Sequence, residues 1–119
     1  MKYFDIFTDY DTFISEWGGI KDAPIDAEIL FAYYGYEDYS GYAFAIFERD
    51  GKLFEAQDAH CSCNGLEVWR PEETTWAALA MRNYDFSRDA KKAFKALVQS
   101  KLRESRAYMA TLELESIPK

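Results

Sequence analysis

An Asp-Gly pair between two apolar segments is the feature that most constrains the fold of this chain. Asp50-Gly51 separates residues 42–48 from residues 52–57, and Asp-Gly in such a setting is a strong signal of a β-hairpin closed by a two-residue type I′ turn. A two-residue turn determines which residues face each other, unless a bulge shifts the register by one. The expected pairs are Arg49 with Lys52, Phe47 with Phe54, Ala45 with Ala56, Gly41 with His60 and, by extrapolation, Asp38 with Cys63.

The other segments add a strand and helices to this hairpin. Their expected positions follow from capping residues, proline and the spacing of apolar residues. They are a helix over residues 12–17, a strand over 28–34, a helix that begins at Pro71-Glu72-Glu73, a helix over 88–108 with Ser87 as its N-cap, and an edge strand or frayed end over 111–117. This order predicts a single α+β domain over residues 1–119, with a small antiparallel sheet of about three strands and helices packed on one face.

The composition argues against several classes of function. Apolar residues make up 49% of the chain, which is enough for a folded core. A net charge of −7 argues against general binding to nucleic acid, whose affinity comes largely from neutralising phosphates. No apolar segment approaches the roughly 20 residues of a membrane helix. The first nine residues lack the apolar region of a signal peptide, so we expect a cytoplasmic location.

The charges are divided unevenly along the chain. Residues 1–79 hold 16 acidic and 5 basic residues, whereas residues 80–119 hold 5 acidic and 9 basic residues. This division suggests either attraction between the two halves or two faces for different partners. Six polar residues at helical spacing form a stripe in the second half, which is either a solvated helix face or a contact for an acidic protein or RNA. They are Arg88, Lys92, Lys95, Gln99, Arg103 and Arg106.

The only histidine and both cysteines of the chain are neighbours in the sequence His-Cys-Ser-Cys. Zinc takes four donors in a tetrahedron and prefers thiolates and imidazole. Cys61 and Cys63 share one face of an extended chain, and His60 joins them if the chain turns between His60 and Cys61. The fourth ligand is Asp38, which the hairpin register places opposite Cys63, or Asp58. We therefore predict a structural Zn²⁺ site.

Two other interpretations of these residues stay open. Cys61 and Cys63 are reduced thiols buried as small apolar residues, or they form a disulfide, which so short a ring would strain. A metal-dependent or thiol enzyme would use His60, Cys61 and Cys63 around an open site. The sequence has no Gly-x-Ser-x-Gly, Walker-type or His-Glu-x-x-His motif, so we expect no catalytic residues and no enzyme activity.

A tract rich in tyrosine and acidic residues precedes the hairpin, at residues 33–39. Tyrosine is enriched where proteins recognise each other, and carboxylates favour a basic partner. Tyr34, Tyr36, Glu37 and Tyr39 are therefore candidate partner-binding residues. The alternative is that these tyrosines pack over a small sheet.

The hairpin and the segment that follows it resemble a family of small phage and prophage proteins. The resemblance lies in residues 36–44, 47–53, 60–67 and 69–74, and the block His-Cys-Ser-Cys-Asn-Gly-Leu-Glu is its most distinctive part. The setting is similar to that of small phage-encoded inhibitors of host immunity, such as zinc-containing anti-CRISPR proteins against type II effector nucleases. The resemblance implies Zn²⁺ bound by His60, Cys61 and Cys63.

These features together predict a binding protein encoded by a phage or mobile element and stabilised by Zn²⁺. It would inhibit a host defence nuclease through protein–protein interaction in the host cytoplasm. We expect a basic, nucleic-acid-binding nuclease as the partner, no direct binding to nucleic acid or membrane, and a monomer or dimer. The competing hypothesis is the metal-dependent or thiol enzyme.

Overall fold

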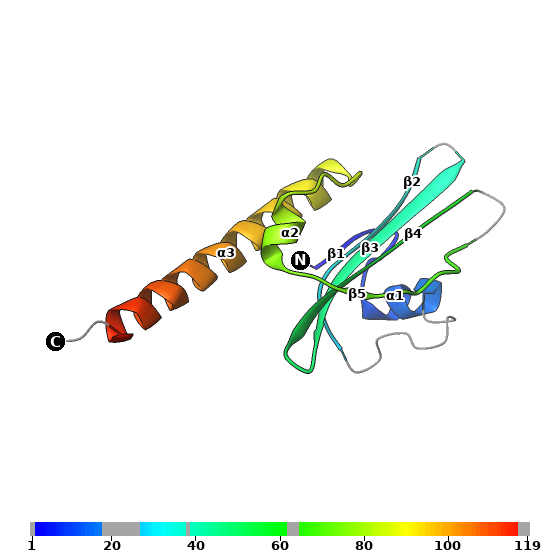
Figure 1. The fold of residues 1–119 in the computed structure, drawn as a ribbon. Helices are drawn as coiled ribbons and strands as arrows, with labels where there is room; N and C mark the ends of the chain where they lie inside the picture. The colour runs from blue at the N-terminus through cyan, green and yellow to red at the C-terminus, as the bar shows by residue number, and fades with distance from the viewer. Residues whose placement is uncertain (1, 18–26, 38, 62–64, 117–119) are drawn as a thin grey trace.

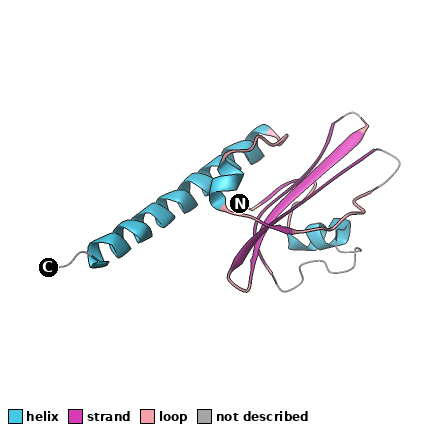
Figure 2. Ribbon diagram, viewed as in Figure 1, coloured by secondary structure: helices cyan, strands magenta, loops and turns pink. Residues whose placement is uncertain are grey.

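A five-stranded mixed sheet forms the centre of the protein in this computed structural model (Figures 1 and 2). The structure describes residues 2–17, 27–37, 39–61 and 65–116, with side chains up to residue 106. The strands lie in the order β1 (Tyr3–Asp5), β2 (Glu28–Glu37), β3 (Ser40–Arg49), β4 (Lys52–Cys61) and β5 (Glu72–Glu73). Strand β1 runs parallel to β2, and the other neighbours are antiparallel. The sheet is therefore larger than the three strands expected, and it is mixed.

The hairpin of β3 and β4 has the predicted register. Arg49 pairs with Lys52, Phe47 with Phe54 and Gly41 with His60. Asp50 and Gly51 have φ angles of 54° and 75°, the positive values that a type I′ turn requires at both central positions. The described pairing ends at Ser40 opposite Cys61, so the predicted pair of Asp38 and Cys63 lies outside the described residues.

Helices cover both faces of the sheet, and the expectation of helices on one face is wrong. Helix α1 (Tyr10–Trp17) buries Phe13 and Trp17 in a cluster with alanines of β2 and β3. On the other face, α2 (Trp76–Ala80) and α3 (Arg88–Ser116) bury Leu79 and Phe94. The reason lies in the central strands, where residues 31–35 and 43–47 are all buried. Strands without polar alternation need cover on both sides.

Three other sequence-based expectations also require correction. Glu72 and Glu73 form the edge strand β5 against β4 instead of a first helical turn, and α2 begins after Thr75, whose side chain accepts a hydrogen bond from the Ala78 amide. The alternating residues 111–116 continue α3 as a helix. Strand β1 was not expected, because three residues are too short for a periodic pattern to show.

Helix α3 makes the molecule elongated. Its 29 residues correspond to roughly 43 Å of helix at 1.5 Å per residue. In Figure 1 its C-terminal part runs away from the sheet, beyond α2, and the molecule measures 66 × 29 × 21 Å along its principal axes. The N-terminal part of α3 packs on the sheet through Ala90, Phe94 and Val98.

Candidate functional site

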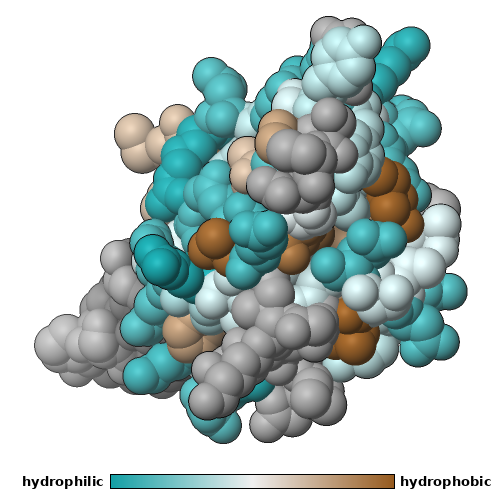
Figure 3. Space-filling view, turned by 90° about the vertical axis from the view of Figure 1, so that its right-hand side faces the viewer, coloured by the Kyte–Doolittle hydropathy of each residue, from teal (hydrophilic) through white to brown (hydrophobic). Residues whose placement is uncertain are grey.

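Most of the predicted site residues lie at one end of the sheet, where β2 leads into β3 and β4 ends. Strand β2 ends at Glu37, β3 begins at Ser40, and Ser40 pairs with Cys61, the last residue of β4. This end of the molecule lies on the right in Figure 1. The view from that side in Figure 3 is mostly hydrophilic, with hydrophobic residues in small separate areas.

The His60 imidazole is held by a hydrogen bond at each ring nitrogen. Its Nδ1 donates to the Cys61 carbonyl at 2.7 Å, and its Nε2 lies 2.6 Å from the Tyr34 hydroxyl. The Tyr34 hydroxyl lies 3.1 Å from that of Tyr36, and the imidazole meets both tyrosine rings edge-on. The ring lies over Gly41, its cross-strand partner. A hydrogen-bonded chain of three side chains thus runs from the core to the surface.

Tyr34 is the buried member of this series of hydrogen bonds. Its side chain is 1% exposed and packs with Phe7 in the cluster under α1. Burial and the neighbouring Tyr36 hydroxyl raise the pKa of Tyr34 above its usual value, so its hydroxyl stays protonated at neutral pH. The sequence placed Tyr34 among the partner-binding residues, whereas the structure places it in the core. Its role is therefore to position His60 and Tyr36.

The predicted zinc ligands are only partly visible. His60 and Cys61 are successive residues of β4, and alternate side chains of a strand face opposite sides of the sheet. The strand continues to Cys61, so the expected turn between His60 and Cys61 does not occur. Cys63 and Asp38 lie outside the described residues, and within the described part of the chain no three His, Cys, Asp or Glu side chains gather as a metal site. Zinc at these residues stays a prediction.

Asp58, the alternative fourth ligand, has a structural role. Its Oδ2 accepts hydrogen bonds from the amides of Glu67 and Val68, at 2.8 and 3.0 Å. Those bonds attach the segment after β4 to the sheet, and the Val68 carbonyl accepts a bond from the Trp17 indole at 2.9 Å. Trp17 and Trp69 meet edge-on in the core, with ring centroids 4.9 Å apart. Asp58 thus helps to hold the segment of residues 65–70 over α1.

Two of the predicted partner-binding tyrosines are on the surface. Tyr36 is 51% exposed and Tyr39 is 80% exposed, and Glu37 between them is also exposed. They belong to a short group of large hydrophobic side chains that are exposed in the described residues, the others being Val68 and Met81. Tyr36 also contacts Tyr34 and His60. The end of the β2–β3 hairpin therefore exposes two rings and a carboxylate to solvent.

A shallow acidic hollow lies at the same end of the sheet on the face covered by α3, whereas the Tyr36 ring packs on the opposite face against Tyr34 and His60. The hollow has a volume of about 240 Å³, and its lining includes the carboxylates of Asp5, Glu37 and Asp85. The Tyr33 ring also lines it, packed against Gly35. Burial raises the pKa of Tyr33, and the nearby charges of Asp5 and Asp85 raise it further. The hollow therefore carries a negative field and suits a cationic side chain.

Tertiary structure alone creates this hollow. Asp5 ends β1 with a φ angle of 61°, and its Oδ1 accepts a hydrogen bond from the Ser87 hydroxyl at 3.0 Å. That bond joins the first strand to the start of α3, 82 residues later. No sequence pattern singles out Asp5 or Asp85, because their contribution depends on the parallel pairing of β1 with β2.

Comparison of the chain with protein-family models, with curated proteins and with solved structures found no match. Among the described residues, no helix combines the length and the apolar character that a membrane span needs. The chemistry of the site itself is therefore the basis for assigning a function.

Proposed function

We propose that this protein is a binding module that attaches to a basic surface of another protein through the end of its β2–β3 hairpin. The observation that carries the proposal is the pair of exposed tyrosines, Tyr36 and Tyr39, on either side of Glu37, whose carboxylate lines the acidic hollow. We call this set of residues the hairpin surface: Tyr36, Glu37, Tyr39, Asp5 and Asp85.

The chemistry of the hairpin surface favours such a partner. Tyrosine supplies a large contact area at low entropic cost, and it is enriched among the few residues that dominate binding energy. Carboxylates around the rings attract lysine and arginine, which speeds association at low salt. The acidic first part of the chain, with 16 acidic and 5 basic residues in 1–79, extends the same field. Tyr34 donates a hydrogen bond to the Tyr36 hydroxyl, and the Tyr34 and His60 rings pack against the Tyr36 ring.

The resemblance to small phage proteins suggests the identity of the partner. A nuclease that binds nucleic acid has a basic surface, and a protein that covers such a surface blocks the substrate without catalysing a reaction. We therefore propose a host defence nuclease, with type II CRISPR effectors as the first candidates. Zinc at His60, Cys61, Cys63 and Asp38 is a separate part of the proposal, and binding it would require His60 to give up one of its two ring hydrogen bonds. Elemental analysis that finds no stoichiometric zinc in the purified protein would remove that part alone.

The test replaces Tyr39 by alanine. Purified type II effector nucleases are passed over the immobilised full-length chain, and the retained complex is titrated at 50 and 300 mM salt. We expect Tyr39→Ala to weaken binding by about 2 kcal/mol, or roughly 30-fold, as for an interface residue that dominates binding. Its free energy of unfolding in urea should change by less than about 0.5 kcal/mol, because the side chain is exposed. Higher salt should weaken the wild-type complex.

Met81→Ala is the matched control. Met81 is 88% exposed and caps α2, away from the hairpin surface, so this variant should bind like the wild type. A complex that survives both Tyr39→Ala and Glu37→Lys would show that another surface makes the contact. If no effector is retained, the nuclease as partner is refuted.

A further inference from the structure

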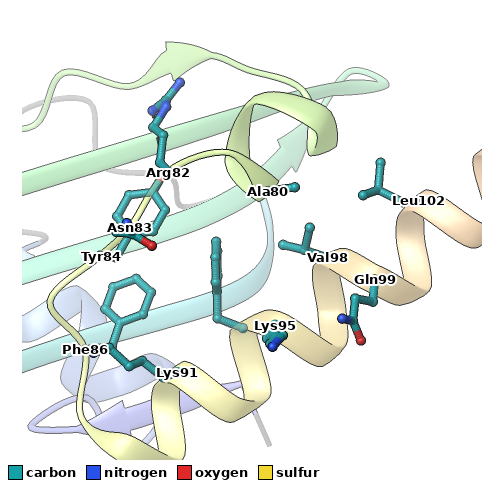
Figure 4. Close-up of a pocket in the computed structure, with 11 residues that line it drawn as sticks. Ala80, Arg82, Asn83, Tyr84, Phe86, Lys91, Lys95, Val98, Gln99 and Leu102 are labelled. Carbon is teal, nitrogen blue, oxygen red and sulfur yellow. Dashed lines mark hydrogen bonds between the residues drawn. The ribbon is translucent and has the colours of Figure 1, made fainter.

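A second hollow lies between α3 and the segment that leads into it, and of its lining residues only Phe86 also lines the acidic hollow. Figure 4 shows this groove, with residues 80–86 on one side and α3 on the other. Its volume is about 450 Å³, which falls within the roughly 300–1,000 Å³ of small-molecule sites. The described residues therefore contain a groove large enough for one ring system with its substituents.

Three aromatic rings form an apolar corner of the groove. Tyr84 and Phe86 lie nearly parallel, with ring centroids 5.2 Å apart and an interplanar angle of 7°. Phe94 meets both of them edge-on, at 5.2 and 5.3 Å. Rings of this arrangement accept another planar ring by stacking or edge contact. The corner therefore suits an aromatic body better than a flexible polar one.

Two lysines of α3 supply positive charge at the rim. Lys91 and Lys95 line the groove one helical turn apart, and both are exposed. Like charges four residues apart destabilise a helix slightly. Within the described residues neither lysine has an ion-pair partner, whereas Arg82 across the groove is paired with the buried Glu55. No carboxylate lines the groove, so its net charge is positive.

We propose that this groove binds a small aromatic anion, meaning a planar ring system that carries a carboxylate, sulfonate or phosphate. The ring lies against Tyr84, Phe86 and Phe94, and the anionic group lies between Lys91 and Lys95. The anion relieves the repulsion between the two lysines, and the ring packs on the half-buried Tyr84 and on the small exposed parts of Phe86 and Phe94. The amides of Asn83 and Gln99 at the rim are additional hydrogen-bond donors and acceptors.

The probe for this site is 1-anilinonaphthalene-8-sulfonate, an aromatic sulfonate whose fluorescence rises in apolar surroundings. We expect the full-length folded chain to bind it at low salt, and the double variant Lys91→Glu/Lys95→Glu to bind it at least 10-fold more weakly. Indole-3-acetate should displace the probe. Tryptamine, which has the same ring with a cationic group, and acetate, which has the anion without the ring, should not displace it.

Lys92→Glu is the matched control, because Lys92 is an exposed residue of the same helix that does not line the groove. Its affinity for the probe should stay within about 2-fold of the wild type, and circular dichroism should show that every variant is folded. If the double variant does not fold, Lys95→Gln replaces it. Absence of probe binding, an equal loss in Lys92→Glu, or equal displacement by tryptamine would overturn the proposal. These variants leave the hairpin surface intact, so this test and that of the proposed function fail independently.

Discussion

At the scale of single residues, Gly41 determines where the His60 ring lies. A Cβ built at position 41 would lie 2.5 Å from His60 Nε2 and 2.8 Å from Cε1, closer than side chains approach. The ring can therefore lie flat over β3 and reach the Tyr34 hydroxyl only because this strand position carries no side chain. The contact between the His60 ring and the Tyr36 ring therefore requires glycine at position 41.

We predict that Gly41→Ala displaces the imidazole and breaks its hydrogen bond to Tyr34. Overpacking at a tight site usually costs about 1–3 kcal/mol, so the free energy of unfolding in urea should fall by about that amount. The imidazole resonances of the single histidine should shift in the NMR spectrum.

Gly65→Ala provides the comparison for Gly41→Ala. A Cβ at position 65 meets nothing within 4 Å, and we expect its unfolding free energy to change by less than about 0.5 kcal/mol. Equal effects of the two substitutions, or unchanged histidine resonances in Gly41→Ala, would contradict this account of the His60 position.

At the scale of elements, the β3–β4 hairpin organises the sheet. Its ten pairs from Arg49–Lys52 to Ser40–Cys61 bring the end of β4 beside the start of β3, so that His60 reaches β2 residues Tyr34 and Tyr36. The turn has positive φ at both central residues, which Gly adopts without strain and Asp tolerates. The two-residue turn therefore sets the register of β3 and β4, and this register places His60 opposite Gly41.

We predict that Gly51→Val destabilises the hairpin by more than about 1 kcal/mol, because a β-branched side chain is strained at a φ angle of 75°. Asp50→Asn should be neutral or slightly stabilising, because Asn-Gly is the most favoured type I′ pair. Thermal unfolding followed by circular dichroism measures both effects. A Gly51→Val protein as stable as the wild type would contradict the role assigned to this turn.

At the scale of the whole molecule, two aromatic clusters on opposite faces of the sheet hold the fold together. One contains Phe13, Trp17 and Tyr34 beneath α1, and the other contains Phe44, Phe86 and Phe94 beneath α3. Five phenols on or near these clusters have a pKa raised above the usual value, with burial as the largest cause in each case. They are Tyr3, Tyr33, Tyr34, Tyr42 and Tyr84.

We predict that these phenols make the protein lose stability in alkaline solution. Below about pH 10 they are protonated in both the folded and the unfolded chain. Above that pH the unfolded chain releases protons that the folded chain retains, so the free energy of unfolding falls as the pH rises. Each phenol contributes at most about 1.4 kcal/mol per pH unit. Urea unfolding at pH 8, 9, 10 and 11 measures the slope.

The variant Tyr42→Phe tests whether tyrosine hydroxyls, and not other groups that titrate in this range, cause the loss of stability. The substitution removes one of the five phenols, together with its hydrogen bond to Gln57. Its loss of stability between pH 10 and pH 11 should therefore be smaller than that of the wild type. A wild-type protein equally stable at pH 8 and pH 11 would show that these hydroxyl groups ionise as readily folded as unfolded.

The local parts of this protein could be predicted from its amino-acid sequence. Asp50-Gly51 predicted the register of β3 and β4, and the start of α3 at residue 88 was predicted correctly, because turn geometry and helix periodicity involve residues close together in the chain. The two exposed tyrosines of the hairpin surface were also among the predicted residues. They were predicted because tyrosine is enriched where proteins recognise each other.

The contacts between distant segments could not be predicted from the sequence and are known from the three-dimensional fold. The cover of both sheet faces, the parallel strand β1 and the hydrogen bond between Asp5 and Ser87 depend on packing between residues far apart in sequence. The His60 ring illustrates the same limit. Its neighbours in sequence suggest a metal ligand, which stays a prediction, whereas its contact with the Tyr34 hydroxyl depends on pairing between β2, β3 and β4. Outside the β3–β4 hairpin, local patterns carry no information on which residues meet across the sheet, because those residues are far apart in the chain.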